Sequence, residues 1–268
     1  MPELAAAEIL LLVVISLLAG IGITAIGPGG VLMTIALFAL TDLSPASVAG
    51  TSIVTHVGTG LVGTWAFWKA GQFETERTWR LARILCATTV VGIPLGIGLN
   101  SLLAREAYGM MLGLFSGVIG MAVWYREQTT ITVARTFLSV RDLGDAGGSS
   151  QIPTGRLVLV GILVAAISSL FGLGGPMICV PGLVAIGVPM LPALAAAQAQ
   201  SIIIASLGAA GYVANDAINW PLAILTAIPQ MIGVVLGARI AQSVPTRGLK
   251  FALAAVLVVL APYLAFWR

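Results

Sequence analysis

Long apolar runs separated by short polar turns fill almost the whole chain. In the first half the runs cover residues 5–26, 30–40, 46–69, 78–103 and 106–125. In the second half they cover 156–171, 176–188, 191–214, 218–241 and 247–266. None has the strict alternation of a barrel strand, and most have the roughly 20 residues that a helix needs to cross a membrane. The pattern predicts an all-α polytopic membrane protein with five helical segments in each half.

The second segment of each half is too short to cross a membrane alone. At about 1.5 Å per residue, residues 30–40 and 176–188 reach only two-thirds of the way across the hydrocarbon. A glycine-rich break precedes each segment, G-P-G-G at 27–30 and G-L-G-G at 172–175, and Pro176 suits the first turn of a helix. We therefore expect each half to contain a broken helix or half-helix hairpin at a G-x-G-G motif.

The composition supports membrane insertion and excludes an ordinary soluble domain. Of the 268 residues, 59% are hydrophobic and only 9% are charged, whereas charged residues make up about a quarter of a soluble domain. The net charge of +3 does not indicate nucleic acid, because the basic residues gather at segment ends, where they orient helices. Cys86 and Cys179 lie in apolar segments without metal-ligand spacing, so neither a metal nor a cofactor is expected. The expected partners are the lipid bilayer and a small substrate.

The charge distribution predicts opposite orientations for the two halves. Basic residues gather on the cytoplasmic side of a membrane protein. The loop between the third and fourth segments carries four of them in the first half, but in the second half its one charged residue is Asp216. Between the fourth and fifth segments the second half is the basic one, with Arg239, Arg247 and Lys250. Two inverted repeats explain this reversal if the first two segments of each half form a hairpin that enters and returns.

This topology divides the chain into three parts. They are a first transmembrane repeat at 1–126, a cytoplasmic linker at 127–154 and a second transmembrane repeat at 155–268. The Gly, Ser and Asp residues of RDLGDAGGSSQIPTG indicate a flexible connector. Both termini are then expected outside the cytoplasm.

The glycine breaks are candidate anion sites. Each break frees backbone amides and carbonyls at membrane depth, which is tolerated only inside the protein or along a polar cavity. The following half-helix begins with a partial positive charge and unpaired amides, and inverted repeats would aim two such helix starts at one point. The alternative is that the glycines only allow tight helix packing. The candidate ligands are Gly27, Gly29, Gly30, Gly172, Gly174 and Gly175.

The third segment of each half carries polar residues near its middle, where they are costly unless they face the protein interior. Hydroxyl groups can bond their own helix, which is the structural alternative. A glutamine amide needs another partner and can donate N–H to an anion. No Lys or Arg lies centrally in any segment, so neutral dipoles would hold the anion. The candidate substrate ligands are Thr51, Ser52, Thr55, Gln198, Gln200 and Ser201.

These motifs resemble the sulfite exporter TauE/SafE family of membrane transporters, also called the 4-toluene sulfonate uptake permease family. The resemblance covers essentially the whole chain. It rests on the two glycine motifs, on Pro181, and on the small-residue helices GTSIVTHVGTG at 50–60 and AQAQSIIIASLGAAG at 197–211. The first half has Ala36 where Pro181 aligns. The resemblance implies a secondary transporter, expected to export a small sulfur-containing anion such as sulfite, thiosulfate or an organosulfonate across the cytoplasmic membrane of a prokaryote.

Two further residues are candidates for coupling and for substrate entry. His56 is the only histidine and falls near the middle of its segment. Imidazole changes charge near neutral pH, so His56 could couple proton and anion occupancy; the alternative is a neutral ring bonded to a neighbouring group. Arg239, a turn or two from the inner end of its helix, could attract anions at the cytoplasmic mouth or anchor the helix at the interface.

Two other functions compete with a transporter. A passive anion channel also needs an anion-tolerant path, and coupling to protons would separate the two. A membrane-embedded enzyme needs a catalytic set, which one histidine, two dispersed cysteines and no central carboxylate do not supply. The sequence therefore favours a secondary transporter that is not an enzyme.

Overall fold

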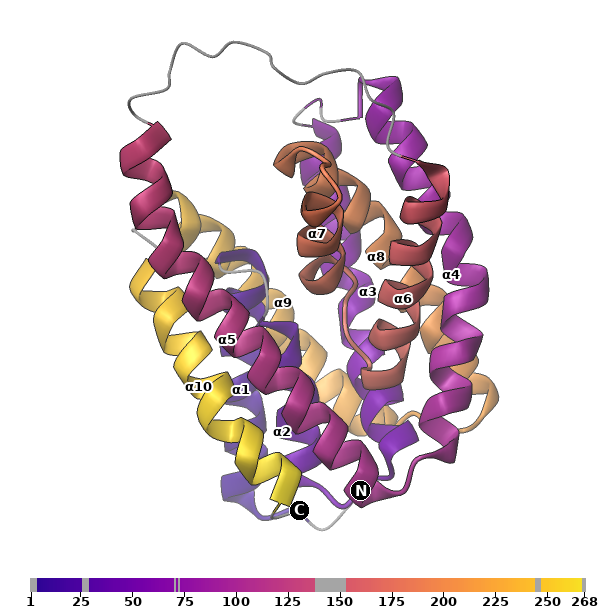
Figure 1. The fold of residues 1–268 in the computed structure, drawn as a ribbon. Helices are drawn as coiled ribbons and strands as arrows, with labels where there is room; N and C mark the ends of the chain where they lie inside the picture. The colour runs from indigo at the N-terminus through magenta and orange to yellow at the C-terminus, as the bar shows by residue number, and fades with distance from the viewer. Residues whose placement is uncertain are drawn as a thin grey trace.

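The computed structural model describes residues 4–25, 29–69, 71, 73–137, 153–243 and 247–266, and this part of the chain consists of helices and short connections (Figure 1). The first half contains α1 (Ala6–Ala25), α2 (Gly30–Leu40), α3 (Pro45–Lys69), α4 (Glu76–Leu102) and α5 (Arg105–Phe137). The second half contains α6 (Thr154–Phe171), α7 (Pro176–Ala185), α8 (Met190–Ala214), α9 (Trp220–Ser243) and α10 (Arg247–Phe266). The predicted all-α fold with five helical segments in each half is confirmed for the described residues.

Two helices end at places different from those expected. Helix α5 continues to Phe137, so residues 127–137, which the sequence suggests as linker, are helical. The rest of that range up to 152 lies outside the described residues. Helix α7 ends at Ala185, because Gly187 has a φ of 94° and the chain turns there through a left-handed residue.

Six helices in the described part are long and apolar enough to span a membrane. Helix α3 also has 25 residues but is less apolar, because several hydroxyl groups and His56 lie in its middle. Helices α2 and α7 have 11 and 10 residues, and roughly 15 Å of helix covers about half of the hydrocarbon. The six spans are Ala6–Thr24, Glu76–Leu102, Arg105–Tyr125, Thr154–Phe171, Pro192–Ala214 and Trp220–Gly237.

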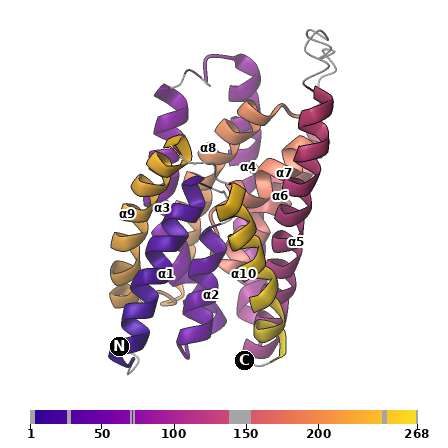
Figure 2. The same ribbon diagram turned by 90° about the vertical axis from the view of Figure 1, so that its left-hand side faces the viewer.

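The helices form a bundle with two distinct ends. Both chain ends lie at one end of the bundle, which we call the terminal face (Figures 1 and 2). Helix α5 ends and α6 begins at the opposite end, which we call the linker face. Helices α1, α3 and α5 run toward the linker face, whereas α6, α8 and α10 run away from it. The short helix α2 begins inside the bundle and returns to the terminal face, and α7 returns to the linker face.

The first helix of each half packs along the fourth helix of the other half. In the α1 and α9 pair, the Thr24 hydroxyl donates to the carbonyl of Val234 at 3.0 Å. In the α4 and α6 pair, the Ser169 hydroxyl donates to the carbonyl of Ile93 at 3.3 Å. A glycine gives each hydroxyl its space, since a methyl group added to Gly237 or Gly96 would lie 2.3 Å or 2.1 Å from it. These reciprocal contacts are what a repeat requires; the inversion of the two halves stays a prediction.

The end of α6 is buried, and side chains from three other helices satisfy its last carbonyl groups. A helix leaves its final carbonyls unpaired, and inside a membrane protein water does not reach them freely. Tyr212 donates to the carbonyl of Ser169 at 2.8 Å, and the Asn100 amide donates to that of Leu170 at 2.7 Å. The Thr34 hydroxyl of α2 donates to the carbonyl of Phe171 at 3.1 Å. The second glycine motif is therefore fixed to α2, α4 and α8.

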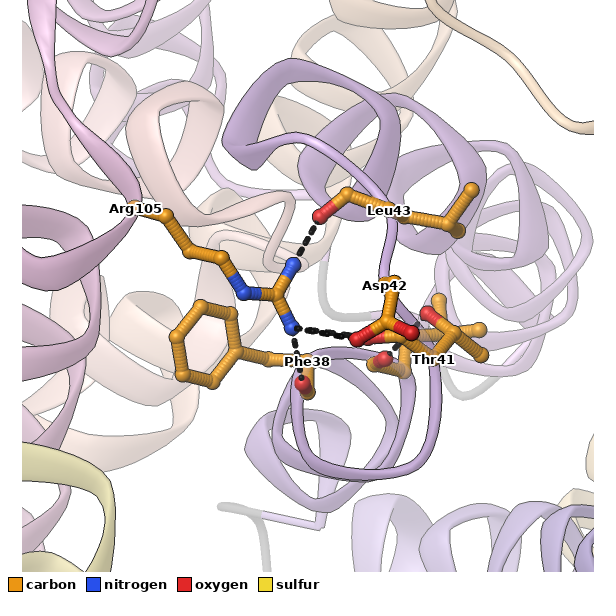
Figure 3. A network of polar contacts seen from close by, with 6 residues as sticks. Phe38, Thr41, Asp42, Leu43 and Arg105 are labelled. Carbon is orange, nitrogen blue, oxygen red and sulfur yellow. Dashed lines mark hydrogen bonds and ion pairs between the residues drawn. The ribbon is translucent and has the colours of Figure 1, made fainter. Parts of the chain in front are cut away.

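The end of α2 is held by a single arginine (Figure 3). Arg105, the first residue of α5, donates through Nη2 to the carbonyls of Phe38 at 3.1 Å and Thr41 at 2.7 Å, and through Nη1 to the carbonyl of Leu43. Its guanidinium also lies over the Phe38 ring, 4.7 Å from the centroid, and 4.0 Å from the Asp42 carboxylate. A cation at a helix C-terminus is favourable, so Arg105 fixes α2 in place.

Candidate functional site

Both half-helices begin close to the His56 ring. A methyl group added to Gly30, the first residue of α2, would lie 2.8 Å from Cε1 of His56. One added to Gly174, two residues before α7, would lie 3.4 Å from Nδ1 of the same ring. Only glycine lets the backbone come this close to the imidazole at Gly30. The structure thus brings both glycine motifs to one side chain of α3.

His56 is buried and has an unpaired ring nitrogen. Its exposed fraction is 1%, and Nε2 has no hydrogen-bond partner. Buried polar atoms are nearly always paired, so an unpaired one needs an explanation. The first N–H groups of a helix have no partner one turn earlier in the same helix, although Pro176 has no N–H, and those of Leu32 and Ile178 donate to the carbonyls of Gly29 and Gly175 at 3.1 Å and 3.3 Å. An unpaired ring nitrogen therefore lies beside two helix starts that carry partial positive charge.

Hydroxyl groups surround this centre. The methyl position built on Gly174 is 3.5 Å from the Ser201 hydroxyl of α8, so His56 and Ser201 face the same glycine. On the α2 side, the Ser52 and Thr34 hydroxyls are 3.0 Å apart, and Thr34 continues to the carbonyl of Phe171. Ser52, Ser201 and Thr34 are all buried. The candidates Gly30, Gly174, Ser52, Ser201 and His56 thus come from both halves and lie at the junction of α2, α3, α8 and the second glycine break.

Three other predicted ligands have their polar groups directed into helix contacts. The Gln200 amide donates to the carbonyls of Leu85 and Gly161, both at 3.2 Å, between α4 and α6. The Thr51 hydroxyl accepts a hydrogen bond from the backbone N–H of Asn219 at 3.0 Å. The Thr55 hydroxyl donates to a carbonyl of its own helix at 2.7 Å. These bonds account for the Gln200 N–H groups and for the two hydroxyls without a ligand, whereas the buried Oε1 of Gln200 has no hydrogen-bond partner.

The remaining glycines of the two motifs serve packing or the turn. A methyl group added to Gly29 would lie 2.4 Å from the carbonyl oxygen of Ala19 on α1. One added to Gly175 would lie 2.8 Å from Cδ1 of Ile204 on α8. Gly172 has a φ of 73° and ends α6, and a methyl group there would lie 2.2 Å from a carbonyl oxygen of α3. Gly27 lies outside the described residues.

Gln198 lies along α3, nearer the linker face than His56. A methyl group added to Gly63 would be 2.7 Å from its Cδ, and Gly63 is about two turns beyond His56. Gln198 is half-buried, in contrast to Gln200. It therefore stands between the buried centre and the linker face. Arg239 belongs to α9 near that face, but its side chain lies outside the described part of the structure.

Thr34 and Gln230 are among the buried polar residues that the sequence reasoning missed. Thr34 lies within an otherwise apolar half-helix, and Gln230 follows Pro229 in the middle of α9. Gln230 is fully buried, and neither of its amide atoms has a hydrogen-bond partner. A polar residue isolated in an apolar segment at membrane depth is the signal that could have found both.

Half-helices that converge on a buried polar centre inside a bundle of spanning helices are the architecture of a membrane transporter. Residues 12–264 match the family described as Sulfite exporter TauE/SafE, and the chain belongs to this family. It is 24% identical to the probable membrane transporter protein YunE of Bacillus subtilis (strain 168), over 93% of this chain and 94% of that protein. It is 23% identical to the probable membrane transporter protein YdhB of the same organism, over 91% of this chain and 95% of that protein. No solved structure matches the chain significantly.

Proposed function

We propose that the protein is a secondary transporter that exports a small sulfur-containing oxyanion, with sulfite, thiosulfate and organosulfonates as the substrate class. The observation that best supports this proposal is that the α2 and α7 helix starts converge on His56, whose Nε2 is buried and unpaired. An anion at this point would accept hydrogen bonds from backbone N–H groups at the starts of both half-helices, except at Pro176, which has none. The family to which the chain belongs supports the sulfur chemistry.

Binding at this site would be weak enough to allow release. The backbone approaches the His56 ring at Gly30 and Gly174, Ser201 lies beside Gly174, and none of these three residues carries a charge. Neutral dipoles hold an anion without the permanent countercharge that an arginine would supply. A site of this kind fits a carrier that must bind and then release its substrate on the other side of the membrane.

His56 would couple the substrate to a proton. A protonated imidazole beside a bound anion is stabilised by it, whereas the same charged ring in a dry, empty site is costly. Anion and proton would then bind together or exchange.

The positions of the basic residues support one membrane orientation. Lys69 ends α3, Arg77 and Arg80 begin α4, and Arg156 begins α6, so all four belong to the linker face. With the linker face in the cytoplasm of a prokaryote, both termini are outside. Reagents that do not cross membranes should label cysteines placed in residues 138–152 only from the cytoplasmic side, and cysteines at either terminus only from outside. Labelling of a terminus and the linker from one side would contradict this orientation.

The test of function is flux in reconstituted vesicles. Purified protein is incorporated into vesicles, and sulfite, thiosulfate, methanesulfonate and sulfate are compared with and without an imposed pH gradient. We expect gradient-driven uphill flux of at least one sulfur anion, lost when an uncoupler collapses the gradient. Flux of every anion that never exceeds its own gradient would indicate a passive channel instead.

His56→Gln separates coupling from binding. Glutamine keeps hydrogen-bonding capacity but does not titrate, so uphill flux should be lost while downhill flux and some binding remain. Uphill flux with an unchanged pH profile in this variant would show that the ring is structural.

A further inference from the structure

Gln230 is a buried amide that the packing of the protein does not use. Its side chain is 0% exposed, and both Nε2 and Oε1 lack hydrogen-bond partners. Among the described residues it is the one side chain with two such unpaired buried atoms. An amide in this state is unfavourable, because burial removes its water without providing another partner.

Gln230 lies at the depth of the α2 start. Its backbone carbonyl packs on Gly20 of α1, where an added methyl group would be 2.0 Å from the oxygen. Gly29, at the start of α2, packs on the neighbouring α1 residue Ala19. The next residue of α9, Met231, packs on Gly58, two positions after His56 on α3, so α9 packs against both α1 and α3. Gln230 thus belongs to the layer that contains His56 and the first half-helix start.

The other fully buried glutamine described near this depth behaves differently. Gln200 of α8 donates to the carbonyls of Leu85 and Gly161, both at 3.2 Å, and so connects α4 with α6. Gln230 makes no such bond on the α1 and α9 side. The buried Oε1 of Gln200 also lacks a partner, but the amide N–H groups of Gln200 bond two helices, whereas neither amide atom of Gln230 is used. The unused amide N–H groups of Gln230 point to a ligand.

We propose that Gln230 is a substrate ligand, and that it makes the site prefer a monoanion that carries its own hydrogen-bond donor, such as hydrogensulfite. This inference rests on the proposed transport of a sulfur oxyanion. The amide N–H can donate to an oxyanion oxygen, but Oε1 can only accept. A sulfate or sulfite dianion, or methanesulfonate, brings acceptors alone and would leave Oε1 unpaired against negative charge. Hydrogensulfite has one hydrogen to donate and satisfies both atoms.

The preference is measured by binding to the purified full chain. The probes are sulfite buffered below and above its second pKa, methanesulfonate as a monoanion without a donor, and sulfate. We expect hydrogensulfite to bind about tenfold more tightly than methanesulfonate, the ratio that one additional buried hydrogen bond to Oε1 provides. In Gln230→Met, which has similar length and no amide, hydrogensulfite affinity should fall about tenfold to the methanesulfonate level.

Thermal stability without ligand distinguishes a ligand from a structural residue. Gln230→Met should unfold at the same or a higher temperature than the original protein, because it removes two unpaired polar atoms. Gln200→Met should unfold at a lower temperature, because it leaves two carbonyls without their donor. Gln230→Leu serves as a second apolar variant if the methionine variant is not recovered from the membrane.

The possible outcomes separate this inference from the proposed function. If the original protein binds and transports no sulfur anion, the proposed function fails and this inference fails with it. If it transports sulfur anions but binds hydrogensulfite and methanesulfonate equally, this inference alone is overturned. The same holds if Gln230→Met keeps the original preference, or loses stability without losing affinity.

Discussion

The two half-helices start alike and end differently. Both begin at a glycine motif beside His56. Helix α2 is buried along most of its length and packs against α1, α3, α5 and α10. It ends where the Arg105 guanidinium donates to its last carbonyl groups (Figure 3). Helix α7 packs chiefly against α8 and α6, has three buried residues, and ends in a turn of its own chain at Gly187. The end of α2 is held by a residue of α5, whereas the end of α7 is capped by its own backbone.

This difference concerns how freely each half-helix can move. In the Gly187 turn, the N–H of Val188 donates to the carbonyl of Leu183 at 3.0 Å, and that of Gly187 to the carbonyl of Val184 at 3.0 Å. Helix α7 therefore carries its own cap and can shift without breaking bonds to another helix. A shift of α2 would break the bonds of Arg105. We infer that α2 is the fixed wall of the site and α7 the moving one.

The largest effect is expected at the entry to α7. Gly172→Ala combines a left-handed φ of 73° with a methyl group 2.2 Å from a carbonyl of α3. Left-handed strain and overpacking together should cost about 3 to 4 kcal/mol. Thermal unfolding in detergent measures the loss. Gly187→Ala is the matched control, because its φ is 94° but nothing lies within 4 Å, so it should lose only about 1 to 2 kcal/mol. Equal losses would mean that the contact with α3 does not hold the α7 entry.

The second-largest effect is expected when the Arg105 guanidinium is removed. Arg105→Ala leaves the carbonyls of Phe38, Thr41 and Leu43 without their donor, and a partly exposed set of this kind is worth about 2 to 3 kcal/mol. Because α2 would then be loose, the apparent affinity for substrate should also fall severalfold. Arg105→Lys should recover part of the stability, since lysine keeps the charge but not the planar guanidinium that donates to several carbonyls at once.

The control for Arg105 is Arg83→Ala, which removes an exposed ion pair to Glu76 on α4. Exposed pairs contribute little, so its thermal midpoint should stay close to the original. If Arg105→Ala is equally harmless, α2 is not held by the guanidinium and the contrast between the half-helices disappears.

The smallest effect is a change in distance on substrate binding. In a variant with both native cysteines replaced, spin labels at Val184 of α7 and Leu159 of α6 should change their separation by on the order of 2 to 5 Å when substrate is added. Labels at Leu40 of α2 and Met110 of α5 should keep their separation. The opposite result would make α2 the moving element.

The helices and their hairpins were determined by the sequence. Apolar runs of about 20 residues have no other stable form in a bilayer than a helix, since every backbone group must be paired within the segment. For the same reason the short segments after 27–30 and 172–175 were identified as half-helices, with starts at Gly30 and Pro176. The end of α5 was harder to predict from the sequence, because residues 127–137 are polar enough to resemble a linker but still form helical turns.

Only the tertiary structure decided which polar residues meet. Thr55, His56, Gln200 and Ser201 are all central and polar in their segments, yet His56 and Ser201 face the second glycine motif while the Gln200 amide bonds two carbonyls between α4 and α6. Neighbouring residues of a helix point about 100° apart, so the rotation of each helix in the bundle selects its site residues. That rotation is fixed by glycines such as Gly20 and Gly233, which set how closely α1 and α9 approach. Periodicity along one segment does not contain this information.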